Sequence, residues 1–317
     1  MKRQKGAALL AAMLTVTLVA TMAAAALWQQ WRSVEVEAAE RSRVQSTWLL
    51  TGALDWARLI LREDARSGGA DHLAEPWAVP LQEARLATFL SMDVSNADAD
   101  RDAFLSGQVS DLQARLNVMN LIDQDKISVP GKLAFDRLFE QLGLPPEQVN
   151  VLADQLLAAK KGARSDGTGN PQAPLLPQRI EQLVWLGLPA ASLSALKPYI
   201  TLLPERTQIN LNTASAEVLQ ASVTGLDPAE AKRLVAARET AHFSTIADAG
   251  QRSAAVREAS SSGQLSVNSR FFEVRGRIRL DQAVVEERSV VQRDGLNVRT
   301  LWRDHDTTPA PAAPPPG

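Results

Sequence analysis

The sequence contains no cysteine and only three histidines among its 317 residues. Without cysteine it forms no disulfides, and thiol nucleophiles, zinc–thiolate sites and iron–sulfur clusters are excluded. His72, His242 and His305 are far apart, so none belongs to a metal-binding pair such as H-E-x-x-H. Nucleophile elbows, Walker loops and dinucleotide fingerprints are also absent from the sequence. We therefore predict that the protein is not an enzyme and has no catalytic residues and no cofactor.

The sequence also has no large excess of positive or negative charge. Lys and Arg number 34 against 36 Asp and Glu, which gives a formal net charge of −2. The chain as a whole thus lacks the basic character typical of nucleic-acid-binding proteins. Its 45% hydrophobic and 22% charged residues are typical of a globular protein, and its length allows an anchor plus one or two domains.

What the sequence does contain is a long apolar run over residues 7–28, whose only polar side chains are threonines. About 20 apolar residues can cross the hydrocarbon core, and a helix satisfies its own backbone there. Lys2, Arg3 and Lys5 precede the run. By the positive-inside rule, we expect a single-pass membrane protein with a cytoplasmic N-terminus and an exported C-terminal region.

The start of this run has three interpretations. A cleaved secretory signal has an apolar region of about 7–15 residues, which is shorter than this run. An ordinary single-pass anchor stays open. Gly6 ends a short basic leader and resembles the cleavage site of a type IV prepilin. That resemblance implies that a prepilin peptidase cuts after Gly6 and that the mature chain begins at Ala7, a candidate for N-methylation.

We expect the helix to continue well beyond the apolar run. No proline or glycine occurs in residues 7–51, and the pattern ends only at Gly68 and Gly69. About sixty residues make a helix about 90 Å long. An apolar stripe along it should pack against partner helices and the protein's own sheet. The residues predicted to pack against partner helices are Trp28, Trp31, Val34, Val44, Trp48, Leu49 and Trp56.

Regular structure is harder to predict for residues 71–105, which contain Pro76 and Pro80. We expect a short helix at residues 81–90 and a polar, acidic loop at residues 96–102. Four carboxylates in this region could suggest a cation site, but the glycine and terminal glutamate of an EF-hand are missing. A solvated loop is favoured for these residues, which are Asp93, Asp98, Asp100 and Asp102.

The middle of the chain reads as a helical block. Residues 106–121 alternate like strands with a break near Asp111, and six helices are expected after them, at 133–142, 148–160, 178–186, 191–200, 214–224 and 228–238. At Gly143, Gly187 and Gly225 an apolar helix ends at the glycine and a leucine follows. The next helix then begins with a capping residue or a proline. Glycine suits the left-handed position after a helix, so these are helix-hairpin-helix-like corners.

The C-terminal part changes to the period of strands. Strands are predicted at residues 264–280, 283–293 and 296–303, with Asp294-Gly295 as a hairpin turn. Three arginines of the first strand (Arg275, Arg277 and Arg279) should share one face, and a solvated sheet face is favoured over a phosphate site. From His305 onward the proline- and alanine-rich tail is expected to be disordered.

One corner raises an alternative function. Residues 209–214 (INLNTA) and the corner at Gly225 resemble the helix-hairpin-helix of membrane-anchored competence DNA receptors. In those proteins a second glycine helps present backbone N–H groups to a phosphate. Here that residue is Asp227, whose carboxylate would repel phosphate and instead cap the helix beginning at Pro228. We interpret the corner as scaffold and expect no nucleic acid among the partners.

Several short motifs in a fixed order resemble the K subunit of type II secretion systems, a large minor pseudopilin of the type IV pilin-like superfamily. They are KGAALL at the leader, RLNVMNL at 115–121, PYITLLP at 198–204, INLNTA at 209–214 and SVNSRFFEVR at 266–275. The resemblance implies an α+β, type IV pilin-like fold. A long N-terminal transmembrane and amphipathic helix packs on an antiparallel sheet, and an all-α, SAM/helix-hairpin-helix-like domain is inserted.

The resemblance also implies a function without catalysis. The subunit would lie at the tip of the periplasmic pseudopilus and initiate its assembly, in support of secretion of folded proteins across the outer membrane. The implied partners are the I- and J-type minor pseudopilins, the prepilin peptidase and the inner membrane. Ala11 stands where major pilins have a glutamate thought to pair with a neighbouring subunit's N-terminus. Because a carboxylate in lipid is costly without a partner, Ala11 suits a subunit with nothing stacked above it.

These expectations divide the chain into seven parts. They are a leader (1–6), a transmembrane helix (7–28), its periplasmic continuation (29–66), a first pilin-like part with strands (67–121), an inserted helical domain with three corners (122–262), C-terminal strands (263–304) and the tail (305–317). Calcium is associated with many relatives of this family. Here Asp154, Asp166 and Asn170 are the candidate calcium ligands near the first corner, fewer than calcium needs, so no cofactor is predicted and calcium binding stays an open alternative.

Overall fold

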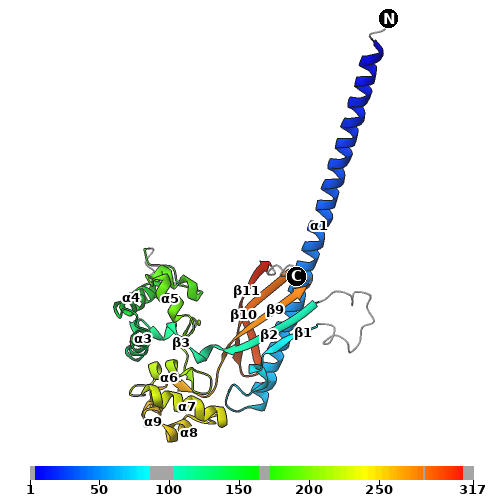
Figure 1. Cartoon of the computed structure of the whole chain (residues 1–317). Coiled ribbons are helices and arrows are strands. Elements are labelled where there is room, and N and C mark those ends of the chain that lie inside the picture. The colour runs from blue at the N-terminus through cyan, green and yellow to red at the C-terminus, as the bar shows by residue number, and fades with distance from the viewer. Residues whose placement is uncertain (1–3, 86–102, 164–171, 281–282, 310–317) are drawn as a thin grey trace.

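The computed structural model describes residues 4–85, 103–163, 172–280 and 283–309. A single helix projects far out of the body, a sheet lies against its lower end, and a separate group of helices lies beside the sheet (Figure 1). The α+β pilin-like architecture predicted from the sequence is therefore confirmed. Residues Asp93, Asp98, Asp100 and Asp102, with the rest of the predicted acidic loop, lie outside the described residues.

The long helix α1 extends from Gln4 to Ser67, as the sequence predicted. The threonine hydroxyls within the apolar run donate hydrogen bonds to carbonyl oxygens of the preceding helical turn. Thr15 Oγ1, for example, donates to Ala12 O at 2.9 Å. Gly68 and Gly69 follow with φ of 69° and 117°. Residues other than glycine rarely adopt a positive φ, and two such glycines in a row explain why the helix ends here.

The sheet contains five antiparallel strands in the order β1-β2-β9-β10-β11. Their bounds are Leu81–Arg85, Ala103–Asp111, Phe271–Leu280, Ala283–Asp294 and Asn297–Pro309. Side chains alternate between the two faces of β9, as expected for a strand covered on one side. The outer face carries the three predicted arginines, each next to a glutamate: Arg275–Glu273 at 2.6 Å, Arg277–Glu286 at 3.6 Å and Arg279–Glu83 at 2.8 Å.

Two sequence-based expectations about this sheet are wrong. Residues 81–85 form strand β1 rather than a helix, because β2 offers them a free edge to pair with. The predicted disordered tail is a strand up to Pro309, since β10 is long enough to pair with it residue by residue, including Glu287 with His305. Residues 86–90 and 310–317, the remainder of both segments, lie outside the described residues.

The helical domain is inserted between the neighbouring strands β2 and β9. Its helices are α3 (Val129–Gln141), α4 (Glu147–Gly162), the 3₁₀ helix η4 (Ile180–Leu186), α5 (Ala190–Leu196), α6 (Ala216–Ser222), α7 (Pro228–Thr240), α8 (Ile246–Arg252) and α9 (Ala254–Ala259). They enclose one core, with Phe135, Leu138 and Phe139 of α3 fully buried in it. The last two helices, α8 and α9, were not predicted.

Short segments complete the chain. The strand pairs are β3 (Leu116–Asn117) with β6 (Ile200–Thr201), β4 (Ile122–Asp123) with β5 (Lys126–Ile127), and β7 (Ile209–Asn210) with β8 (Leu265–Ser266). Single turns of 3₁₀ helix are η1 (Pro76–Ala78), η2 (Leu112–Ala114), η3 (Val118–Leu121) and η5 (Ser260–Ser262). The three corner glycines Gly143, Gly187 and Gly225 have φ of 64°, 86° and 81°, which confirms their predicted left-handed conformation.

A buried polar network joins the helical domain to the sheet. Asp111, at the end of β2, accepts hydrogen bonds from Thr213 Oγ1 and Ser269 Oγ at 2.6 Å and from Asn210 Nδ2 at 3.1 Å. Burial raises the pKa of Asp111, and these donors partly offset that cost. Nearby, the rings of His72 and His242 stack with centroids 3.8 Å apart. These contacts attach the helical domain to the segment that follows α1.

Candidate functional site

One face of α1 is covered by the protein's own sheet. Leu50, Leu54, Ala57 and Leu61 recur at spacings of four, three and four residues, and all are buried. They pack against apolar residues of the inner sheet face and η1, among them Trp77, Phe272, Val274 and Ile278. None of the four was among the contact residues predicted from the sequence. Their helical spacing was the signal that could have identified them.

Gly276 lets α1 approach the middle of the sheet. A Cβ atom built on this residue of β9 would lie 2.9 Å from Leu50 Cδ2, closer than real Cβ contacts come. The atom it would meet is the end of a flexible side chain, so the glycine leaves room for Leu50 rather than being strictly required by the backbone.

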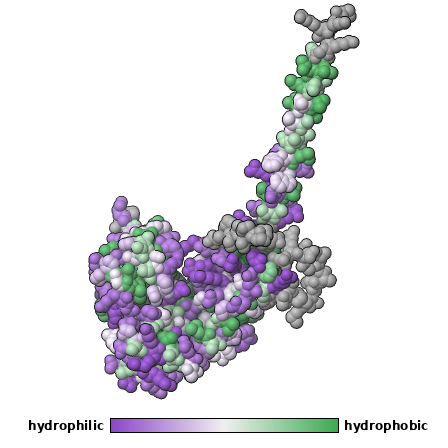
Figure 2. All heavy atoms as spheres, in the orientation of Figure 1, coloured by the Kyte–Doolittle hydropathy of each residue, from purple (hydrophilic) through white to green (hydrophobic). Residues whose placement is uncertain are grey.

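The residues predicted to contact partner helices lie elsewhere on α1. Trp28, Trp31, Val34, Val44, Trp48 and Trp56 are all exposed, while Leu49 is half-buried beside the core. The protein's own sheet therefore covers only Leu49 of this set, and the packing of these residues against partner helices stays a prediction. Every residue from 7 to 40 is exposed, and Figure 2 shows hydrophobic side chains over much of this projecting length. A helix with an uncovered apolar surface needs lipid or another protein to cover it.

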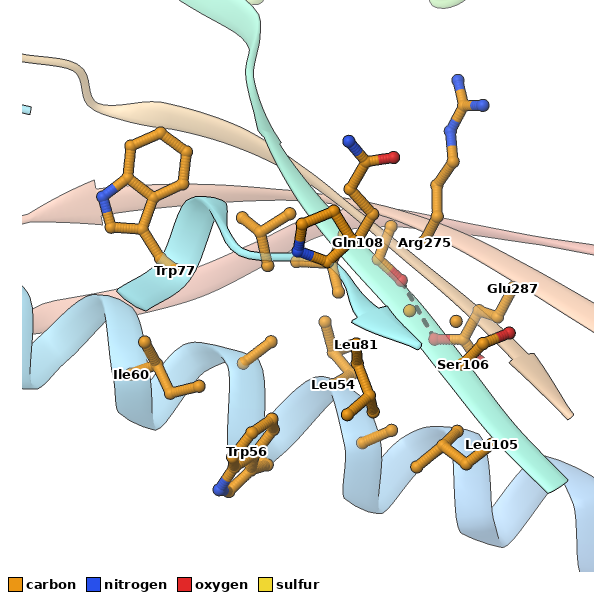
Figure 3. Close-up of a pocket in the computed structure, with 18 of the residues that line it drawn as sticks. Leu54, Trp56, Ile60, Trp77, Leu81, Leu105, Ser106, Gln108, Arg275 and Glu287 are labelled. Atoms are coloured by element: carbon orange, nitrogen blue, oxygen red, sulfur yellow. Dashed lines mark hydrogen bonds between the residues drawn. The ribbon is translucent and has the colours of Figure 1, made fainter. Parts of the chain in front are cut away.

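A pocket opens beside the part of α1 that lies on the sheet. It has a volume of about 250 Å³ and lies between α1, η1, β1 and β2. Figure 3 shows Trp56 and Ile60 of α1 on one side, and Trp77, Leu81 and Leu105 around the others. Trp56 at its rim is 53% exposed. The pocket is a mainly apolar concavity next to the predicted contact stripe.

A buried carboxylate lines the sheet side of this pocket. Glu287 of β10 is 4% exposed, and its Oε1 accepts a hydrogen bond from Ser289 Oγ at 3.0 Å. Its Oε2 lies 2.9 Å from His305 Nε2, on the strand that was predicted to be disordered. This contact helps explain why β11 continues past residue 304.

Three carboxylates at the lower end of α1 form the one cluster in the described part of the chain that could hold a metal. Oxygens of Asp64, Asp71 and Glu75 lie within 4.8 Å of one another. Arg293 already binds two of them, with Nη1 at 2.5 Å from Asp64 Oδ2 and Nη2 at 2.5 Å from Asp71 Oδ1. The guanidinium thus supplies the positive charge that a metal would bring.

The protonation of these carboxyl groups reflects their burial. Burial raises the pKa of Asp71 to about 6, against the lowering effect of Arg293. Burial also raises the pKa of Glu75 to about 7, although the His72 backbone N–H and Trp77 Nε1 donate hydrogen bonds to it. For His72, burial and then the neighbouring His242 lower the pKa. Through Arg293, the cluster links the end of α1 and the segment after it to strand β10.

Of the three calcium candidates, only Asp154 lies among the described residues. Asp154 is exposed on α4. Asp166 and Asn170 lie outside the described residues.

The corner that suggested DNA binding is built as a helix cap. Asp227 Oδ1 accepts a hydrogen bond from the backbone N–H of Glu230 at 2.7 Å, as predicted. Arg238 donates from Nη1 to Leu211 O at 2.6 Å, and burial lowers its pKa to about 10. One of the nearby basic side chains is thus used within the domain, which leaves less positive charge for a phosphate.

The predicted processing residues lie at the start of α1. Gly6 and Ala7 are within the first turns of the helix. The part of α1 from Ala7 onward is the one described helix that is long and apolar enough to cross a membrane, a test that a signal sequence near the N-terminus would also pass. The described residues therefore contain one helix suited to be a membrane anchor.

Comparison with known proteins finds similarity to one family. Two family models, both described as type II secretion system (T2SS), protein K, match residues 114–205 and 209–268. The type II secretion system protein K of Pseudomonas aeruginosa is 27% identical and aligns with 96% of this chain and 90% of its own length. The protein of the same name from Klebsiella pneumoniae is 28% identical, covering 95% of this chain and 96% of that protein.

A solved structure shares the fold. It is described as the GspK-GspI-GspJ complex from the type 2 secretion system of enterotoxigenic Escherichia coli. The matching chain has a TM-score of 0.60 and 19% sequence identity, and covers 85% of this chain and 99% of itself. The family models, the full-length relatives and the shared fold agree with one another. The chain is therefore similar along nearly its whole length to the protein K proteins of type II secretion systems, and this similarity supports a minor pseudopilin.

Proposed function

We propose that this minor pseudopilin caps the periplasmic pseudopilus as a non-enzymatic subunit that initiates its assembly. The observation that carries the proposal is the exposed length of α1, whose apolar residues the protein's own sheet does not cover. Partner helices would bury this surface, beginning with Trp28, Trp31, Val34, Val44, Trp48, Leu49 and Trp56. The described complex of a similar fold contains GspI and GspJ, so I- and J-type pseudopilins are the proposed partners.

The membrane arrangement follows from the leader. Residues 1–6 would be removed by prepilin peptidase after Gly6, leaving Ala7 as the mature N-terminus and a candidate for N-methylation. Residues 7–28 would span the inner membrane with the N-terminus cytoplasmic and residues 29–317 periplasmic. At position 11 the chain has alanine. An uncharged residue there suits a subunit with no neighbour above it, because it leaves no carboxylate to be paired in lipid.

Co-purification tests the proposal most simply. The full chain, expressed with I- and J-type pseudopilins, is expected to be recovered with both from solubilised membranes. The alternative, a membrane-anchored DNA receptor, requires salt-dependent binding of the purified chain to duplex DNA, since counterion release accompanies phosphate contacts. Such DNA binding without pseudopilin recovery would overturn the proposal.

The leader has a test of its own. Replacing Gly6 with valine is expected to block processing, so the chain isolated from membranes would retain all six residues of the leader (1–6) when its mass is measured. A mature chain that still began at Ala7 would show that Gly6 is not the recognised residue.

A further inference from the structure

A charged cleft lies between the outer face of the sheet and the helical domain. It has a volume of about 760 Å³, and all five strands of the sheet and Lys197, at the end of α5, line it. Figure 3 shows Gln108 and Arg275 pointing to this face of the sheet, away from α1. The volume is in the range of clefts that bind organic ligands, about 300–1,000 Å³.

The carboxylates that line this cleft are already paired. The first three pairs, with their N–O distances, are Arg277–Glu286 at 3.6 Å, Arg279–Glu83 at 2.8 Å and Arg179–Asp304 at 3.0 Å. The fourth carboxylate, Glu287, is buried and contacts Ser289 and His305. These four groups therefore neutralise charges other than those of the cluster described next.

Three arginines share a single glutamate. The side chain of Glu273 is fully buried, and its Oε1 accepts a hydrogen bond from Arg275 Nε at 2.6 Å while its Oε2 accepts one from Arg288 Nε. Both oxygens are thus used. Arg115, just after η2, is attracted by Glu273, but its side chain makes neither a hydrogen bond nor an ion pair with any of the described residues.

This arginine cluster (Arg115, Arg275 and Arg288) has an excess of positive charge. Three positive charges face the one negative charge of Glu273. Burial lowers the pKa of Arg115, Glu273 partly offsets this, and Arg275 and Arg288 then lower the pKa further. Because a guanidinium binds a carboxylate through paired hydrogen bonds, the cluster is suited to further carboxylates.

The form of the cleft indicates what kind of molecule brings these carboxylates. Successive side chains of an extended peptide point to opposite sides, so one peptide can meet the arginine cluster on the sheet and Lys197 on the helical domain. Lys197 is exposed, and its Nζ lies 2.7 Å from Glu181 Oε1. The cleft is also lined by side chains that exchange hydrogen bonds with a peptide backbone, namely Gln82, Ser106 and Gln108.

We propose that this cleft binds an acidic peptide segment of another protein, with its carboxylates on the arginine cluster and beside Lys197. The proposal is independent of the proposed function, because the cleft lies on the face of the sheet opposite α1. It accounts for three arginines around one glutamate where the neighbouring arginines have one carboxylate each. Binding should weaken as salt rises, since Arg275 and Lys197 are exposed.

Two peptides test the ligand class. The full chain is held in nanodiscs of neutral lipid, and binding of a short fluorescein-labelled peptide of alternating aspartate and serine is followed by fluorescence anisotropy. It is expected to bind at least about tenfold more tightly than the same peptide with asparagine in place of aspartate. Equal binding of the two peptides would overturn the proposal. Inorganic phosphate that displaced the peptide as effectively as the unlabelled peptide does would also overturn it, because the site would then take a free anion.

Substitutions test the position of the site. Arg115→Gln and Lys197→Gln are each expected to weaken binding of the aspartate peptide about tenfold. Arg115→Gln breaks no ion pair of the folded chain, and Lys197→Gln changes an exposed side chain. Arg279→Gln is the matched control, since Arg279 is on the same strand but does not line the cleft, and it should change binding less than about twofold. Equal weakening by all three variants would contradict the proposal.

A thiol provides a second readout that removes no charge. The natural chain has no cysteine, so Ser106→Cys places a single thiol in the cleft and Ser261→Cys places one on η5, outside it. At a peptide concentration of about ten times Kd, maleimide labelling of the Ser106→Cys thiol should slow about tenfold, and that of the Ser261→Cys thiol less than about twofold. Unchanged labelling of the Ser106→Cys thiol would show that the peptide binds elsewhere, which overturns the proposal.

Discussion

The two ends of α1 differ in what covers their apolar side chains. Both are apolar helix surface, but residues 46–61 lie on the protein's own sheet, whereas residues 7–40 are exposed throughout. The covered end is closely fitted, with Gly276 admitting Leu50 and Arg293 fixing the last turns. The exposed end has tryptophans and valines without a counterpart in the described part of the chain. The difference suggests that the covered end serves folding and the exposed end serves membrane insertion and assembly.

The largest expected effect of a single substitution is at the ion pairs of the covered end. Arg293→Ala should lower the free energy of unfolding by about 4 kcal/mol, because it leaves Asp64 and Asp71 without their cation. The matched change at the exposed end, Arg41→Ala, removes the surface pair with Glu37 and should cost about 0.5 kcal/mol or less. Urea unfolding followed by tryptophan fluorescence compares the two. Equal losses would contradict the distinction between the ends.

Two leucine-to-alanine substitutions compare the same two ends of α1. Leu61→Ala should lower the free energy of unfolding by about 3 kcal/mol, since Leu61 is 0% exposed against the sheet and its loss leaves a cavity. Leu27→Ala, at an exposed position of the projecting helix, should change it by about 0.5 kcal/mol or less. If Leu61→Ala were as mild as Leu27→Ala, α1 would not be packed on the sheet as described.

The smallest expected effect is a pH dependence of the covered end. The pKa of Glu75 is raised from 4.5 to about 7, so the folded state holds a proton that the unfolded state has lost. The free energy of unfolding should therefore fall as pH rises from about 4.5 to 7, by about 1 kcal/mol after allowance for the partial exposure of Glu75. The lowered pKa of His72 acts in the opposite direction near pH 6.5.

The variant Glu75→Gln isolates this carboxyl group. Its stability should depend less on pH between 5 and 7 than that of the natural protein, as measured by urea unfolding at each pH. An unchanged pH dependence would mean that Glu75 does not carry the raised pKa.

Local pattern was enough to predict much of this fold. The length of α1, the three glycine corners and the hairpin at Asp294-Gly295 depend on neighbours in sequence, and the structure confirms them. Strand β1 and the end of β11 were mistaken because their structure depends on partners far away in sequence, β2 and β10. A short segment without clear alternation takes its conformation from the edge it pairs with.

The functional surface was predicted only in part. Periodicity identified α1 as amphipathic, but α1 has apolar residues on more than one face, and spacing alone does not say which face the sheet covers. Leu54 and Trp56 illustrate this, because they are two residues apart and only Leu54 is buried. Long-range polar contacts such as Asp71 with Arg293 had no signal in the sequence.

The central claim, that this chain is the terminal subunit of its assembly, is tested most directly by counting its copies. Native mass spectrometry of the complex released from membranes, after co-expression with I- and J-type pseudopilins, measures this number. The proposed function predicts one copy of this chain in each complex, because a subunit with Ala11 in the membrane has no neighbour stacked above it. Two or more copies in one complex would contradict a position at the tip.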